Sequence, residues 1–129
     1  MDSPKPTSKS ILFVTTVLAI SLLVTATANA MTLRELRQLE RANPKQGQWY
    51  VQYYLIGVLE GLLEANAVAV RQGGTALFCL SDKRLDSTQA KAIFDAERTS
   101  NADLYEADMP VQLVMANALS TIYPCKTPK

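Results

Sequence analysis

The two cysteines constrain the fold of this chain more than any other feature, because both follow an N-terminal segment typical of exported proteins. They are Cys79 and Cys125, in a chain of 129 residues. In an oxidising compartment, a single pair of cysteines most simply forms one internal disulfide. Closing a loop of this length would stabilise the fold by about 4 kcal/mol in the chain-entropy description. A free thiol or an intermolecular bridge is the alternative.

The first 30 residues have the order of a cleavable secretory signal. Lys5 and Lys9 precede an apolar stretch at 11–24, and residues 28–30 read Ala-Asn-Ala, the small-residue pattern that signal peptidase accepts. The apolar stretch is short for a membrane span. We therefore expect cleavage after Ala30, a periplasmic location and a mature domain of residues 31–129. Retention as an uncleaved membrane anchor is the alternative.

The chain after residue 30 carries no excess charge. Two of the 13 Lys and Arg residues and one of the 12 Asp and Glu residues lie in the N-terminal segment, which leaves 11 of each. A strongly basic surface is the usual mark of proteins that bind nucleic acid or anionic membranes. We therefore expect no nucleic-acid partner and no membrane association after signal cleavage. No segment after residue 30 is expected to cross a membrane.

Apolar residues after residue 30 recur at helical spacing, and no useful stretch alternates as a strand would. Thr32 and Glu35 have the spacing of a capping box, Pro44 and Pro124 favour helix ends, and Gly73-Gly74 is a typical stop signal. The expected helices are 32–43, 49–71, 86–99 and 110–122, with a polar linker at 44–48 and one helical turn near 104–105. This predicts an all-α fold of four to five helices in a compact single domain, closed by one disulfide.

The long helix over 49–71 is expected to lie at the centre of the fold. Its apolar positions wrap more than half of its circumference, and they include Tyr50, Tyr53, Tyr54, Gly57, Val58, Leu62, Ala65, Val68 and Ala69. Gly57 and Gly61 lie one turn apart, and each weakens a helix by about 1 kcal/mol relative to Ala. We therefore expect another backbone to pack closely against these two glycines.

An aromatic cluster marks the start of the long helix. Trp49, Tyr50, Tyr53 and Tyr54 could be anchors for a binding partner, but such clusters more often belong to a core. We favour the core interpretation. Trp49, at the edge of the helix, is the best candidate for exposure.

The sequence has few residues suited to catalysis or metal binding. It has no histidine, which removes the commonest general base and the commonest metal ligand, and paired cysteines would leave no thiolate. Glu60 and Glu64 share a helix face and could form a carboxylate pair for acid–base work or metal binding. A solvated helix face is the interpretation we favour. We therefore expect no catalytic residues, no metal and no cofactor.

Two charged segments are candidates for partner binding. Asp82, Lys83 and Arg84 would form a loop close to Cys79, and a disulfide there would lower the entropy cost of using the loop for recognition. The second segment is polar and acidic, with Asn101, Asp103, Glu106 and Asp108. An ordinary solvated turn is the alternative for both segments.

Four short motifs follow one another in the chain. They are Tyr54-x-x-Gly57-Val58, Phe78-Cys79-Leu80, Ala118-Leu119 and Tyr123-Pro124-Cys125. In this order, on an exported protein of this size, they resemble the type VI secretion amidase immunity (Tai/Rap) family. The resemblance covers roughly residues 49–125. The chain differs from many relatives at Ser81, where they carry proline, and in having no further cysteine near the start of the long helix.

The resemblance implies a small periplasmic helical protein, usually dimeric, that binds a peptidoglycan-cleaving effector and blocks its active site. The expected partners are a cognate cell-wall hydrolase and a second copy of the chain. The alternative is a non-enzymatic structural or chaperone-like periplasmic protein on the same scaffold. An enzyme that uses Glu60 and Glu64 is a third and weaker hypothesis.

Overall fold

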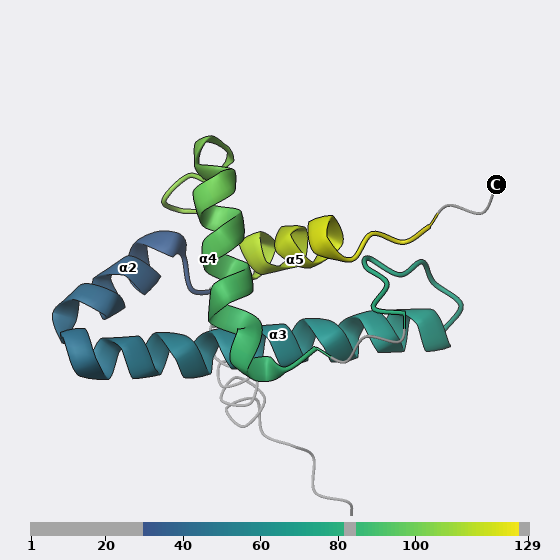
Figure 1. Ribbon diagram of the computed structural model, residues 1–129, viewed down its shortest axis with the longest axis horizontal. Helices are drawn as coiled ribbons and strands as arrows, with labels where there is room; N and C mark the ends of the chain where they lie inside the picture. The colour runs from purple at the N-terminus through teal and green to yellow at the C-terminus, as the bar shows by residue number, and fades with distance from the viewer. Residues whose placement is uncertain (1–29, 82–84, 127–129) are drawn as a thin grey trace, which may run out of the picture.

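The computed structural model describes residues 30–81 and 85–126, and Figure 1 gives the labels of its elements. Over these residues it has four α-helices and two short 3₁₀ helices, η1 and η2. They are α2 (Leu33–Ala42), α3 (Pro44–Arg71), η1 (Ser87–Gln89), α4 (Ala90–Ser100), η2 (Ala102–Leu104) and α5 (Val111–Ile122). The all-α fold predicted from the sequence is confirmed. The predicted signal peptide, up to residue 29, lies outside the described residues.

The long helix α3 holds the domain together. In Figure 1, α2 folds back along the first half of α3, α4 crosses α3, and α5 runs beside its second half. All three of these helices contact α3, and α4 and α5 also contact each other. The central position expected for the long helix is therefore confirmed.

The polar linker expected at 44–48 is wrong, because α3 already begins at Pro44. Asn43 is the N-cap of α3, and its side-chain oxygen accepts a hydrogen bond from the backbone N–H of Gln46 at 3.2 Å. Proline suits the first position of a helix, where its missing N–H is not needed and its φ angle is already helical. The same Pro44 that ends α2 therefore starts α3, and Asn43 is the whole connection.

The glycine that permits close packing is Gly47. It is buried where α3 meets α2, and an added Cβ would collide with the backbone carbonyl oxygen of Leu39 and lie 3.2 Å from that of Glu40. By contrast, Gly57 and Gly61 are exposed, and no atom of the described residues lies within 4 Å of a Cβ added at either. Within residues 30–81 and 85–126, the expected close packing at Gly57 and Gly61 is therefore not found.

The fully buried stripe of α3 is narrower than the broad apolar surface of the helix. Val51, Leu55 and Leu59 are fully buried, whereas Tyr50 is 52% and Tyr53 is 65% exposed. The core interpretation of these two tyrosines is wrong, and the expected exposure of Trp49 is confirmed at 59%. The other buried apolar residues come from α2, α4, α5 and the chain after α3: Leu33, Leu36, Phe78, Ala90, Ile93, Phe94, Val111, Val114, Met115, Ala118 and Leu119.

Helix α3 is long and apolar enough to cross a membrane by length and composition alone. Its most apolar 18-residue window has a mean hydropathy of 1.3, and 17% of that window is buried. The expectation that no segment after residue 30 would be apolar enough to cross a membrane is therefore wrong as a statement of length and composition. A mostly buried helix of a folded domain can pass the same test, whereas most of this window is exposed and Val51, Leu55 and Leu59 provide its packing against neighbouring elements.

The start of α2 is tied to the start of α5. The predicted capping box is present: the Thr32 hydroxyl accepts from the backbone N–H of Glu35, and the Glu35 carboxylate accepts from the backbone N–H of Thr32 at 2.7 Å. This hydrogen bond lowers the pKa of Glu35. Thr32 also forms an isolated antiparallel bridge with Pro110, and the N–H of Val111 donates to the carbonyl of Met31 at 2.9 Å. Segments about 80 residues apart in sequence are thereby joined.

Candidate partner-binding surface

The end of α4 and the turn after it form a projecting tip, which we define as residues 101–106. Figure 1 shows that this end of α4 extends beyond the other helices. The helical turn expected near 104–105 is present as η2. Leu104 is 66% exposed, and the side chains of Asp103 and Glu106 are exposed beside it. The tip therefore offers one apolar side chain between two acidic ones.

A buried carboxylate fixes the shape of the tip. Glu97, in the last two turns of α4, is 8% exposed. Its Oε1 accepts hydrogen bonds from the Asn101 side-chain amide at 2.9 Å and from the Tyr105 hydroxyl at 2.6 Å. The amide of Asn117 on α5 donates to the same Tyr105 hydroxyl at 3.2 Å. Burial, and then the hydrogen bond to Glu97, raise the pKa of Tyr105.

Glu97 was not among the predicted site residues, although the sequence carries a signal for it. It follows Ala90, Ile93 and Phe94 at helical spacing, so a carboxylate lies on the face that these apolar residues bury. Charged residues are almost never fully buried unless they are paired or hydrogen-bonded. A glutamate at such a position therefore indicates polar partners nearby, which here come from Asn101 and Tyr105.

The base of the tip is attached to α2. Arg34 makes an ion pair with Asp108 at 2.9 Å, and the backbone N–H of Arg34 donates to the carbonyl of Ala107 at 2.8 Å. Both charged side chains are more than half exposed, so the ion pair itself contributes at most about 1 kcal/mol. The four predicted residues of this segment therefore divide in two. Asn101 and Asp108 hold the segment in place through side-chain bonds. The side chains of Asp103 and Glu106 make no hydrogen bond or ion pair with any described residue.

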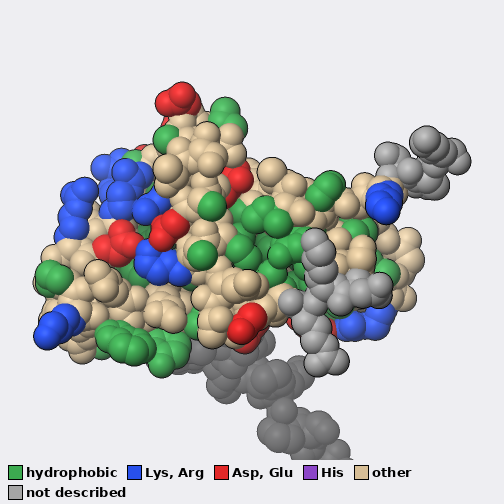
Figure 2. Space-filling view, viewed as in Figure 1, with side chains coloured by type: hydrophobic (Ala, Val, Ile, Leu, Met, Phe, Trp, Pro, Cys, Tyr) green, Lys and Arg blue, Asp and Glu red, His purple; other side chains and the backbone are tan. Residues whose placement is uncertain are grey.

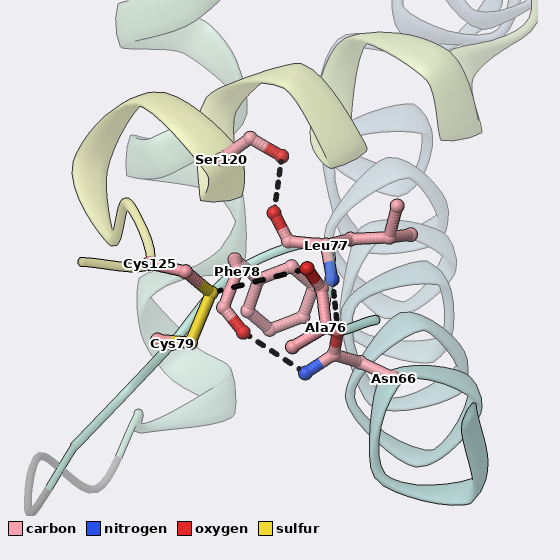
Figure 3. Close-up of a disulfide and its surroundings, with 7 residues drawn as sticks. All are labelled: Asn66, Ala76, Leu77, Phe78, Cys79, Ser120 and Cys125. Carbon is pink, nitrogen blue, oxygen red and sulfur yellow. Dashed lines mark hydrogen bonds between the residues drawn. A yellow bond between two sulfur atoms is a disulfide. The ribbon is translucent and has the colours of Figure 1, made fainter. Parts of the chain in front are cut away.

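The predicted disulfide is present between Cys79 and Cys125, whose Cα atoms are 4.8 Å apart. It joins the chain that follows α3 to the chain that follows α5 (Figure 3). The backbone N–H of Cys79 also donates to the carbonyl of Tyr123 at 2.8 Å. Asp82, Lys83 and Arg84, the charged loop expected close to this disulfide, lie outside the described residues.

Asn66 on α3 positions the segment that leads to Cys79. Its side-chain oxygen accepts from the backbone N–H of Leu77 at 2.8 Å, and its side-chain nitrogen donates to the carbonyl of Phe78 at 3.0 Å. Figure 3 shows these bonds beside a third, in which the Ser120 hydroxyl of α5 donates to the carbonyl of Leu77 at 3.2 Å. The segment thus lies between α3 and α5, with the N–H and C=O of Leu77, the C=O of Phe78 and the N–H of Cys79 hydrogen-bonded and with Phe78 buried.

The carboxylate pair on α3 has the surroundings of a solvated helix face. Glu60 and Glu64 are exposed, and Glu64 makes an ion pair with Arg71 at 2.7 Å. Within residues 30–81 and 85–126, no group of three or more His, Cys, Asp or Glu side chains is placed to hold a metal ion.

No protein-family model, no curated protein and no solved structure matches this chain.

Proposed function

We propose that this protein is a periplasmic immunity protein that binds a secreted peptidoglycan-degrading effector of the amidase type and sterically blocks its active site. The observation that carries the proposal is the projecting tip, with exposed Leu104 at its end and buried Glu97 beneath it. A short projection of this kind is suited to enter a cleft. The resemblance of the sequence motifs to the immunity family agrees with this role.

The internal bonds of the tip favour binding. A loop that must be ordered when it binds loses conformational entropy, and this loss weakens the complex. Here the Glu97 carboxylate already holds Asn101 and Tyr105, and Arg34 holds Asp108. These bonds restrain the tip in the free protein, so binding would cost less conformational entropy than it would for an unrestrained loop.

We also propose that the protein forms a homodimer through the exposed face of α3. Trp49, Tyr50 and Tyr53 are each more than half exposed there, and Trp49 and Tyr53 stack with ring centroids 6.2 Å apart. Gly57 and Gly61 continue the same helix with open space above them, so a second helix could approach closely. Sedimentation equilibrium over a range of protein concentrations tests this proposal. A single monomeric mass at every concentration would contradict it.

The partner is best sought with the oxidised protein carrying a C-terminal tag, applied to secreted and periplasmic proteins of the native strain and its neighbours. We expect one cell-wall hydrolase in stoichiometric amount, with its activity lost in the complex. Recovery of many unrelated proteins would instead favour the chaperone-like alternative, which the exposed aromatic face of α3 would also suit. Recovery of no specific protein would contradict the immunity role.

A matched pair of leucines tests the tip. Leu104 is 66% exposed on the tip, and Leu77 is 62% exposed at the opposite end of the domain, close to the disulfide. Leu104→Ala is expected to weaken binding of the hydrolase about tenfold, as truncation of an interface anchor typically does. Leu77→Ala removes the same side chain from the other end and should leave affinity unchanged. Equal affinities of the two variants would exclude the tip as the contact.

A further inference from the structure

A groove lies on the α2 side of the tip, and its walls are rich in arginine. It has a volume of about 400 Å³ and is lined by side chains of α2 and α4 and by the tip residues Ala102 and Tyr105. The charged residues in its wall are Arg37, Glu40, Arg41 and Arg98. Figure 2 shows basic side chains gathered over this part of the molecule, with acidic ones between them. Arg37 and Arg41 also line a second, smaller hollow of about 210 Å³.

The acidic side chains near the groove are already matched by basic ones. Lys91 and Arg98 on α4 lie within 4.0 Å of Glu40, and both also pair with Asp95. Two positive and two negative charges therefore balance within this network. The remaining charged residues of the groove wall are Arg37 and Arg41, which leave a local excess of two positive charges.

Both of these arginines have donors available for a ligand. The Nε–H of Arg37 donates to the backbone carbonyl of Leu33 at 3.2 Å, which orients the side chain and leaves its two terminal nitrogens unengaged by any described residue. Arg41 makes no hydrogen bond or ion pair with the described part of the chain. The two residues are four positions apart on α2, so they lie on the same face one turn apart.

We propose that this groove binds an acidic segment of the partner protein, with Arg37 and Arg41 receiving its carboxylates. A guanidinium group matches the two oxygens of a carboxylate with two parallel hydrogen bonds, and this geometry selects carboxylates. The tip residues Ala102 and Tyr105 line the groove, so a partner that receives the tip also reaches the groove. The proposal rests on the proposed binding function, because it names the chemistry of the surface that the partner presents.

The groove can be tested without the hydrolase. The probe is the peptide acetyl-Gly-Asp-Glu-Glu-Gly-amide, titrated into the isotopically labelled oxidised protein and followed by NMR, including the arginine Nε–H signals. We expect saturable shifts at Arg37, Arg41 and Tyr105 that weaken as salt is added. The neutral peptide acetyl-Gly-Asn-Gln-Gln-Gly-amide should cause none. Equal shifts with the two peptides, or shifts only outside the groove, would overturn the proposal.

Three variants make the test quantitative. The double variant Arg37→Gln/Arg41→Gln is expected to weaken binding of the acidic peptide about three- to tenfold. Glu40→Gln should strengthen it, because Asp95 alone then offsets only one of the two positive charges of Lys91 and Arg98. Arg71→Gln, which removes an arginine paired with Glu64 at the far end of α3, is the control and should have no effect. Equal losses in the Arg71 variant and the double variant would show a general charge effect and contradict the groove.

Three further outcomes test this proposal, and the last two separate it from the proposed function. If inorganic phosphate displaces the acidic peptide from the groove at equal concentration, the site does not select carboxylates and the proposal is wrong. If the hydrolase binds the Arg37→Gln/Arg41→Gln variant as tightly as the original protein, the proposal for the groove is wrong and the proposed immunity role is unaffected. If the acidic peptide binds the groove and no hydrolase is recovered, the groove stands and the immunity role fails.

Discussion

Gly47 and Gly57 occupy the same helix, and their surroundings assign opposite roles to them. At Gly47 the backbone of α2 approaches so closely that a methyl group has no room, whereas at Gly57 a methyl group would meet open space. Glycine in a helix interior lowers stability relative to alanine through its backbone entropy. The first glycine is therefore needed for packing, and the second weakens an isolated protomer.

This contrast predicts opposite effects of the same substitution. Gly47→Ala is expected to lower the free energy of unfolding by about 1–3 kcal/mol or more, because backbone atoms must move. Gly57→Ala should raise it by about 0.5–1 kcal/mol. Denaturant titrations at a protein concentration that keeps the chain monomeric measure both values. Similar destabilisation by the two substitutions would mean that another element covers Gly57 in the folded protomer.

The sequence alone would not have distinguished these glycines. The spacing of Gly57 and Gly61 predicts that both share a helix face, which is correct, but spacing does not say what that face meets. The role of Gly47 depends on the path by which α2 returns along α3, and that path depends on a connection of one residue at Asn43. Glu97 is different, since its place in an apolar pattern could have been read directly from the sequence.

At the scale of elements, the start of α2 was easier to predict than the start of α3 or the faces that become buried. The capping box at Thr32 and Glu35 has a local cause and is confirmed. On α3, apolar residues occur on nearly every side, so periodicity gave no single buried stripe. The stripe that is buried, at Val51, Leu55 and Leu59, is decided by where α2, α4 and α5 pack, which is information outside the helix.

The segment between α3 and Cys79 depends on one side chain of α3. Asn66→Ala removes two hydrogen bonds to the backbone of Leu77 and Phe78, and it should lower the free energy of unfolding by about 1–3 kcal/mol. Hydrogen exchange at the Leu77 amide should accelerate by more than the global change explains. Asn117→Ala, which removes one exposed hydrogen bond to Tyr105, is the control. An unchanged exchange rate at Leu77 in the Asn66 variant would contradict this role.

At the scale of the whole molecule, the fold has two ends that are stabilised differently. At one end, α2 and the base of the tip are joined by backbone hydrogen bonds and by the pair of Arg34 and Asp108. At the other end, residues 74–81, which follow α3, have no regular secondary structure. The disulfide joins this segment to the chain that follows α5. The cysteine pair was predictable from sequence because only one pairing exists within the chain.

The disulfide therefore predicts a large and local response to reduction. Reduction, or Cys79→Ser, should lower the free energy of unfolding by about 2–4 kcal/mol and the melting temperature by more than about 8 °C. The loss should be greatest near the disulfide, so exchange at the Leu77 and Cys79 amides should accelerate before exchange in α2. The double variant Cys79→Ser/Cys125→Ser should have the melting temperature of the reduced protein, and added reductant should not change that temperature. If reduction leaves the melting temperature unchanged, then Asn66, Ser120 and the burial of Phe78 hold this end without the covalent bond.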